Sequence, residues 1–335
     1  MKRITHALLP ALALLAGHAA GAERLTLNIA YQDAGFPALI DKSGVLQGAP
    51  YDVKWVLLTG PAANLSALYG KAIDLGHMGD TSLTIEQANA REPWTAQNAP
   101  LKIVAGWRND YSKQFSRLIT AVRTSAHIDS PKDLAGHTWA YNYGGYNHAQ
   151  YLGSLVKAGL TEQAIKPIKF NDGASSAAAF VSGQTDVYSG DLGAILPAIN
   201  KGQAKVLLTD QDTGIPALGV WTTRSDVIAD PQKDQALQDY FARLSHYWAW
   251  HQAHQAEATE VLQSTLKLTP ERAAYEYNVR GGAFRPFDNT LLDAEQHVAD
   301  TLLEGGAIKR KVDVRLGFDG RYNNAQQAVP VKEVP

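Results

Sequence analysis

Two segments of the sequence follow the same pattern, and this repeat constrains the fold more than any other feature. The first is GPAANLSALYGKAIDLGHMGD, residues 60–80, and the second is DGASSAAAFVSGQTDVYSGD, residues 172–191. Each has a helix-like run that ends at a glycine, then an aspartate (Asp74 or Asp186), an apolar strand-like run and a Gly-Asp pair. A long-period repeat of helix, turn and strand predicts two similar α/β lobes rather than a solenoid.

The rest of the chain up to Thr223 agrees with an α/β fold of mainly parallel sheets. Apolar runs of strand length alternate with segments of helical length, whereas residues 226–304 are helix-like throughout. The strand-like runs are residues 25–31, 52–58, 101–107, 117–122, 137–142, 165–170, 205–209 and 218–223.

We therefore expect two lobes joined by a two-strand hinge. Lobe 1 contains residues 24–118 and 222–322, lobe 2 contains residues 119–221, and residues 323–335 form a flexible tail. The two crossings lie near residues 118–122 and 218–222. In sheets of this kind the ligand crevice lies beyond the carboxyl ends of the strands.

The start of the chain predicts export. Residues 1–22 combine a basic start, an apolar run too short to span a bilayer and a small-residue cleavage site, which is typical of a secretory signal peptide. The chain contains no cysteine, so we expect neither disulfides nor a lipid anchor. Its formal net charge of −2 and its lack of a basic tract argue against nucleic acid as a partner.

The quoted repeat, together with NIAYQDAG (28–35) and SPKDLAGHTWAYNYGGYNHAQYLGSLVKAGL (130–160), resembles a family of periplasmic solute-binding proteins. These proteins belong to ABC importers, and the resemblance is to the aliphatic sulfonate, taurine and nitrate group, related to the thiamine-precursor binders. It covers about residues 24–265 and implies a type II periplasmic binding protein fold. It also implies a monomer without cofactor or catalytic residues, which hands its solute to a membrane permease driven by an ATPase.

The resemblance implies an oxyanion held in the cleft between the lobes, where helix N-termini offer free N–H groups. Asp80 and Asp191 would repel an anion, so either they point away or the ligand also carries an amine. The candidate ligand-binding residues are Gln32, Gly79, Asp80, Thr81, Arg108, Asn142, Gly144, Tyr146, Asn147, His148 and Asp191.

Arginine and aromatic residues add two further expectations. Arg108 begins a polar loop after a strand and is a candidate for pairing with the anion, whereas Arg117 is expected to be a solvated surface residue. The aromatic residues either line the cleft, for a ligand with an apolar body, or belong to the strand core. They are Trp107, Tyr111, Trp139, Tyr141, Tyr143, Tyr146 and Tyr151.

Two other interpretations compete with an organosulfonate receptor. Within the same class, the ligand is an uncharged heterocycle such as a thiamine-precursor aminopyrimidine. In a different class, the chain is an exported hydrolase, but Ser154-Leu-Val-Lys157 lacks the S-D-N and K-T-G companions of the S-x-x-K motif. His251 and His254 are three residues apart and could share a helix face and bind a metal, but no H-E-x-x-H motif accompanies them, so we expect them on the outer face of an amphipathic helix.

Overall fold

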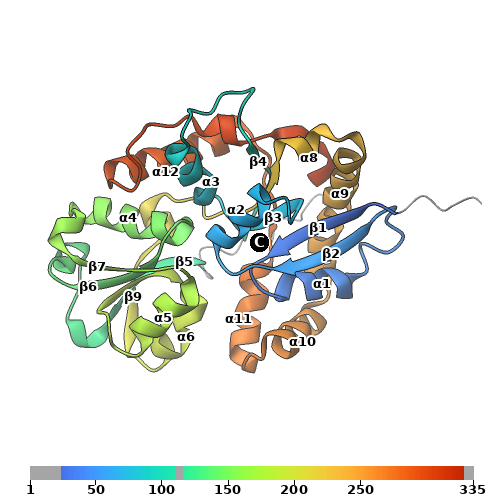
Figure 1. Cartoon of the computed structure of the whole chain (residues 1–335). Coiled ribbons are helices and arrows are strands. Elements are labelled where there is room, and N and C mark those ends of the chain that lie inside the picture. The colour runs from blue at the N-terminus through green and yellow to red at the C-terminus, as the bar shows by residue number, and fades with distance from the viewer. Residues whose placement is uncertain (1–23, 110–115, 328–335) are drawn as a thin grey trace, which may run out of the picture.

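The computed structural model describes residues 24–109 and 116–327, and it contains two β-sheets that lie side by side, each flanked by helices (Figure 1). The predicted signal peptide and Tyr111 lie outside the described residues. None of the helices in the described ranges combines the length and hydropathy that a membrane span requires.

Both sheets combine strands from separated parts of the chain. The first has six strands in the order β11-β4-β10-β3-β1-β2, and the second has five in the order β7-β6-β8-β5-β9. The six-stranded sheet contains β1 (Thr26–Tyr31), β2 (Asp52–Leu57), β3 (Leu75–Gly79), β4 (Leu101–Arg108), β10 (Gly219–Arg224) and β11 (Ala283–Phe284). The five-stranded sheet contains β5 (Leu118–Arg123), β6 (Thr138–Asn142), β7 (Lys166–Phe170), β8 (Val187–Asp191) and β9 (Ala204–Thr209).

Strand direction confirms the predicted α/β class. β1 to β4 share one direction in the first sheet, and β6 to β9 share one direction in the second. β5 and β10, the first strands after the chain crosses between the sheets, run antiparallel to both of their neighbours. The orders 2-1-3-10-4 and 7-6-8-5-9 are therefore the same topology, and each crossing strand fills the same place in its sheet.

Helices connect these strands, and after β10 the chain is helical apart from the two-residue strand β11 and short turns. Asp80, Asp172 and Asp191 accept hydrogen bonds from N–H groups in the first turns of three of them, so the repeat also supplies the caps. The first lobe contains α1 (Gly35–Ser43), α2 (Pro61–Tyr69) and α3 (Thr81–Asn89), and the second contains α4 (Tyr146–Ala158), α5 (Gly173–Val181), α6 (Leu192–Asn200) and α7 (Asp210–Thr213). The later helices are α8 (Ser225–Ala229), α9 (Pro231–Ala253), α10 (Gln255–Leu266), α11 (Pro270–Arg280), α12 (Asn289–Glu304) and α13 (Asn323–Gln326). Short 3-10 turns lie at Thr124–Ala126, Pro131–Leu134, Glu162–Ala164, Val314–Gly317 and Gly320–Tyr322.

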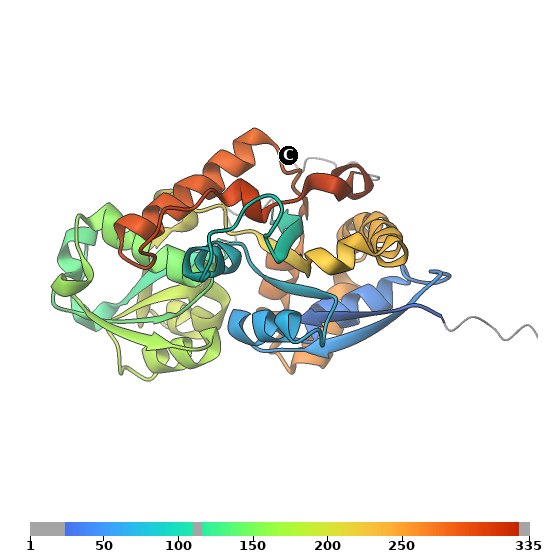
Figure 2. The same cartoon turned by 45° about the horizontal axis from the view of Figure 1, so that its top comes forward.

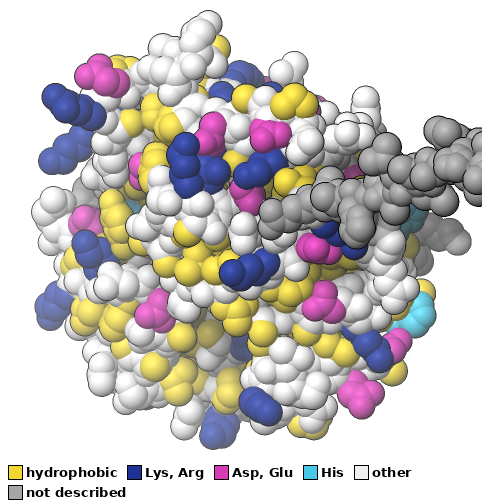
Figure 3. Space-filling model, turned by 45° about the vertical axis from the view of Figure 1, so that its right-hand side comes forward, with side chains coloured by type: hydrophobic (Ala, Val, Ile, Leu, Met, Phe, Trp, Pro, Cys, Tyr) yellow, Lys and Arg dark blue, Asp and Glu magenta, His cyan; other side chains and the backbone are white. Residues whose placement is uncertain are grey.

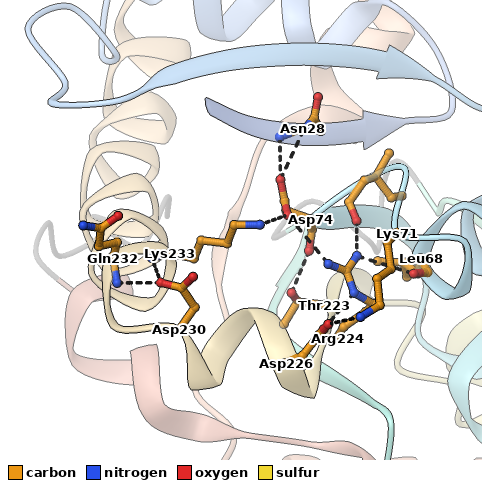
Figure 4. A network of polar contacts seen from close by, with 11 residues as sticks. Asn28, Leu68, Lys71, Asp74, Thr223, Arg224, Asp226, Asp230, Gln232 and Lys233 are labelled. Atoms are coloured by element: carbon orange, nitrogen blue, oxygen red, sulfur yellow. Dashed lines mark hydrogen bonds and ion pairs between the residues drawn. The ribbon is translucent and has the colours of Figure 1, made fainter. Parts of the chain in front are cut away.

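The two repeated aspartates that precede β3 and β8 have the same structural role. Asp74 Oδ2 accepts a hydrogen bond from the N–H of Asn28 in β1 at 2.9 Å, and Asp186 Oδ2 accepts one from the N–H of Thr138 in β6 at 3.2 Å. Asp74 also pairs with Lys233 at 2.8 Å, within the network shown in Figure 4. The repeat therefore ties β3 to β1 in the first sheet and β8 to β6 in the second.

Helix α12 links the two halves of the molecule. It lies over α3 and α4 (Figure 2), and one hydrophobic cluster joins Val298 and Leu302 of α12 with Leu152 of α4 and Ile85 of α3. The C-terminal part of the chain, which the sequence assigned to lobe 1, therefore also packs on the five-stranded sheet's side.

Two details of the predicted layout need correction. β10 lies wholly in the six-stranded sheet, so we propose to place the return crossing before Gly219 rather than at residue 221. The predicted tail begins too early, because Gln326 of α13 is buried and donates from Nε2 to the Val104 carbonyl at 2.9 Å.

On the face shown in Figure 3, Lys, Arg, Asp and Glu side chains are interspersed, in keeping with the absence of a basic tract.

Candidate functional site

A cavity of about 330 Å³ lies between the two sheets. The last residues of four strands line it: Tyr31 of β1, Gly79 of β3, Asn142 of β6 and Asp191 of β8. The carboxyl ends of strands from both sheets thus face one space, which is where an open α/β sheet binds its ligand.

Two helices begin at this cavity without a side-chain cap. Gly60 precedes α2 and Gly145 precedes α4, and neither can offer a side-chain acceptor to the first N–H groups of its helix. The first N–H groups of a helix have no partner within the helix, and the macrodipole makes this end positive. These two N-termini therefore favour an anion at the cavity, whereas α3, α5 and α6 are already capped by aspartates.

Arg117 lines the same cavity as the N-termini of α2 and α4. Its guanidinium is 5.1 Å from the ring centroid of Trp107 and 5.4 Å from that of Tyr146. Its Nε is buried and has no hydrogen-bond partner among the described residues. The expectation that Arg117 is a solvated surface residue is wrong, because rings from β4 and α4 enclose its side chain while it lines the cavity.

Two further arginines at the cavity are already paired. Arg272, Glu276 and Arg280 are four residues apart and share one face of α11. Glu276 pairs with Arg272 through Oε1 and with Arg280 through Oε2, the latter at 3.0 Å. Arg280 also pairs with Asp33 at 2.9 Å and holds the pKa of that carboxyl below its usual range against the effect of burial. The sequence reasoning missed these residues, since nothing in the helical C-terminal part pointed to the cleft.

The residues of the first repeat have separate roles. His77 of β3 lines the cavity, and its Nε2 accepts a hydrogen bond from Trp107 Nε1–H at 3.0 Å. Burial and the positive charge of Arg117 lower the pKa of His77 to about 3, so the ring is neutral at physiological pH. Asp80 lies behind the cavity wall and accepts from the backbone N–H groups of Thr81 at 2.6 Å and Leu218 at 2.7 Å. Both carboxylate oxygens of Asp80 are therefore bound to backbone N–H groups, and Asp80 does not line the cavity.

Asp191 differs from Asp80 in that it lines the cavity while its Oδ1 accepts from Gly193 N–H at 2.7 Å. Burial raises the pKa of its carboxyl, and the charge of Glu276 raises it further. Among the predicted ligand-binding residues, the cavity is lined by Gln32, Gly79, Asn142, Tyr146, Asn147 and Asp191.

The other predicted residues do not line the cavity. Thr81 is buried and its hydroxyl donates to Asp80 at 2.9 Å. Arg108 is exposed at the end of β4. Gly144 has a φ of +90°, a backbone conformation that favours glycine. His148 is buried against Tyr141, with ring centroids 5.1 Å apart.

Most of the predicted aromatic residues belong to the core and not to the cavity wall. Trp107, Trp139, Tyr141 and Tyr151 are buried core residues, and only Tyr146 of the predicted set that the structure describes lines the cavity. Tyr31 and Phe36 line it instead. The expected outer-face position of His251 is also wrong, because its ring is buried and stacks on Tyr277 at 4.4 Å.

Two α/β lobes of one topology, with a cavity between them at the ends of their strands, define the periplasmic binding protein fold. The model of the family described as "NMT1/THI5 like" matches residues 69–236, half of the chain, and the chain belongs to this family.

Comparison with known proteins gives sulfonate-binding relatives. The chain is 25% identical over 293 residues to the "Putative aliphatic sulfonates-binding protein" of Escherichia coli (strain K12), covering 86% of this chain and 87% of that protein. The structure is similar to the alkanesulfonate-binding protein SsuA from Xanthomonas axonopodis pv. citri bound to MOPS, with a TM-score of 0.74 and 20% identity over 89% of this chain and 99% of that one. It is also similar to the periplasmic aliphatic sulphonate binding protein SsuA from Escherichia coli, with a TM-score of 0.73 and 22% identity over 92% and 95% of the two chains.

Proposed function

We propose that this protein is the periplasmic substrate-binding component of an ABC importer and that it binds a small organosulfonate in the cavity. The observation that carries the proposal is the buried Nε of Arg117, which has no partner among the described residues and lies beside two uncapped helix N-termini. A guanidinium and free helix N–H groups match the oxygens of an oxyanion in both charge and geometry.

The cavity also sets the size and character of the solute. A volume of about 330 Å³ is at the lower end of the range for small-molecule sites, so the solute is small. Tyr31, Phe36 and Tyr146 supply apolar surface for a short organic body. The names of the relatives support a sulfonate over nitrate or bicarbonate.

The transport role rests on the two-lobed fold. Binding of the solute shifts the equilibrium between an open and a closed form towards the closed form. The closed form, a monomer, then delivers the solute to a membrane permease driven by an ATPase. No cofactor and no chemical step are involved.

The experiment that tests this function is a binding panel on ligand-stripped protein that begins at Glu23. It contains ethanesulfonate, MOPS, taurine, longer alkanesulfonates, sulfate, nitrate, bicarbonate and an aminopyrimidine, and it records thermal shifts followed by calorimetry. A ligand at 100 times its Kd adds about 2.7 kcal/mol to the free energy of unfolding, which such a scan detects. We expect shifts with sulfonates, recovered chemically unchanged. A shift with the aminopyrimidine alone overturns the sulfonate, and conversion of the compound overturns the receptor role.

A further inference from the structure

His77 is held between aromatic rings at the wall of the cavity. It is the third residue of β3, and only 5% of its surface is exposed. Its ring stacks on Tyr31 with centroids 5.0 Å apart, and it lies nearly parallel to Trp107 at 6.5 Å. The position of the imidazole is therefore fixed before any ligand arrives.

The hydrogen bond from Trp107 also fixes the tautomer. An indole N–H can only donate, so the Nε2 that receives it must be unprotonated. The charged groups that face His77 are Arg117, Asp33 and Arg280, and the two arginines act with burial to keep the ring neutral. A neutral imidazole with an unprotonated Nε2 carries its proton on Nδ1.

This Nδ1–H has no acceptor among the described residues. It also differs from Nδ1 of His148, which is fully enclosed in the protein and unpaired. Because His77 lines the cavity and its Nδ1 is not enclosed, the N–H is accessible from the cavity. Both this N–H and the buried Nε–H of Arg117 are therefore donors without an acceptor among the described residues.

Trp107 positions both of these donors. Its indole N–H holds the His77 ring, and its ring face lies 5.1 Å from the Arg117 guanidinium. Trp107 itself is fully buried and does not line the cavity.

We propose that His77 is a neutral hydrogen-bond donor to the anionic head of the bound solute through Nδ1–H, and that Trp107 is the positioning residue that fixes its tautomer. This assignment rests on the proposed function, because it requires an anion in the cavity. A donor that stays neutral does not gain or lose a proton between pH 5 and 8, so its contribution to affinity is constant across this range.

The first test is ¹⁵N NMR of the full mature protein labelled at histidine, without ligand and with ethanesulfonate. We expect His77 to carry its proton on Nδ1 in the free protein from pH 5 to 8. Ethanesulfonate should shift the Nδ1 resonance of His77 and leave that of His148 in place. A proton on Nε2, or an Nδ1 resonance that does not move on saturation with ethanesulfonate, overturns the proposal.

The second test uses matched variants and calorimetry with ethanesulfonate. Loss of a hydrogen bond to a charged group lowers affinity about tenfold or more, which is the decrease expected for His77→Leu. His148→Leu removes another buried, neutral histidine outside the cavity and should bind as the parent does. His77→Asn places an amide N–H near the position of Nδ1 and should recover part of the affinity.

Trp107→Phe keeps an aromatic ring but removes the indole N–H together with the five-membered ring that carries it. It should allow both neutral tautomers of His77, so part of the His77 population should carry its proton on Nε2 in the NMR spectrum and affinity for ethanesulfonate should fall. Parent-like affinity in His77→Leu overturns the role of His77 while leaving the sulfonate function intact. Failure of every anion to bind the parent protein overturns the proposed function, and the role of His77 with it.

Discussion

Gly79 and Tyr146 lie in contact across the cavity, although Gly79 belongs to the six-stranded sheet and Tyr146 to α4, which packs on the five-stranded sheet. A Cβ built on Gly79, the last residue of β3, would be 2.3 Å from Cδ1 of the Tyr146 ring at the start of α4. Real Cβ contacts are essentially never this short. The glycine is therefore required for the two halves of the molecule to approach each other as closely as they do here.

We predict that Gly79→Ala weakens ligand binding more than it weakens folding. The added methyl group meets a ring of the opposite lobe, so the strain arises on closure. Overpacking of this kind typically costs 1–3 kcal/mol, which corresponds to a decrease in affinity of about 5- to 150-fold. Calorimetry with the ligand found by the panel measures the affinity, and denaturant unfolding without ligand measures the free energy of unfolding.

The matched control is Gly190→Ala in the second repeat. A Cβ at Gly190 would be 2.2 Å from the hydroxyl of Tyr188, which belongs to the same strand and is fully buried. Here the strain lies within one lobe, so this variant should lose about 1–3 kcal/mol of unfolding free energy. Equal loss of stability in both variants would show that the Gly79 contact is not specific to closure.

Arg117→Met should lower affinity for sulfonates at least tenfold, because it removes the cation at the cavity that has no ion pair among the described residues. Arg108→Met removes an exposed arginine from the preceding strand end and carries the same change in net charge. Calorimetry at two salt concentrations separates direct binding from long-range attraction. If the two variants bind alike, the anion is not held by Arg117.

Asp74→Asn and Asp186→Asn test the two repeated aspartates that precede β3 and β8. The Asp74 side chain is 6% exposed and pairs with Lys233, with Arg224 at 3.9 Å, whereas the Asp186 side chain is 39% exposed and pairs with His137. Breaking a buried pair costs about 3–5 kcal/mol, and an exposed one about 1 kcal/mol or less. Urea unfolding should therefore give a much larger loss for Asp74→Asn, and similar losses would contradict this ranking.

Glu295→Gln tests a buried carboxyl on α12. Burial and the negative charge of Asp80 raise the pKa of Glu295 well above its ordinary value near 4.5, so the folded state holds a proton that the unfolded state releases. The unfolding free energy of the parent therefore contains a contribution that decreases as pH rises above about 4.5. The glutamine variant lacks this contribution, so its stability relative to the parent should increase from pH 5 to 8 in urea titrations. A pH-independent difference would mean that Glu295 is ionised in the folded protein.

The fold could be predicted because its signals are local. The helix–turn–Asp–strand–Gly-Asp repeat lies within about twenty residues and survives as the same topology in both sheets. The direction of β5 and β10 could not be read from their sequences, since apolar runs look alike in parallel and antiparallel strands.

The site was harder because its chemistry depends on partners distant in sequence. Whether Arg117 is solvated or enclosed depends on Trp107 and Tyr146. Aromatic residues favour both strand cores and ligand walls, so Trp139 and Tyr151 could not be told from Tyr31 by composition. The arginines of α11 reach the cavity only because this helix returns to it from the C-terminal part.

β5 follows the strands of the six-stranded sheet but lies in the five-stranded one, and β10 does the reverse. This arrangement sets the order in which the two sheets can be completed as the chain is made. Every strand of the five-stranded sheet is present once the chain has reached Thr209, but the six-stranded sheet lacks a central strand until Arg224 has been supplied. Until then β3 and β4, neighbours of β10 in the finished sheet, have unpaired edges that invite association with other chains. The half that starts first in the sequence is thus the half that finishes last.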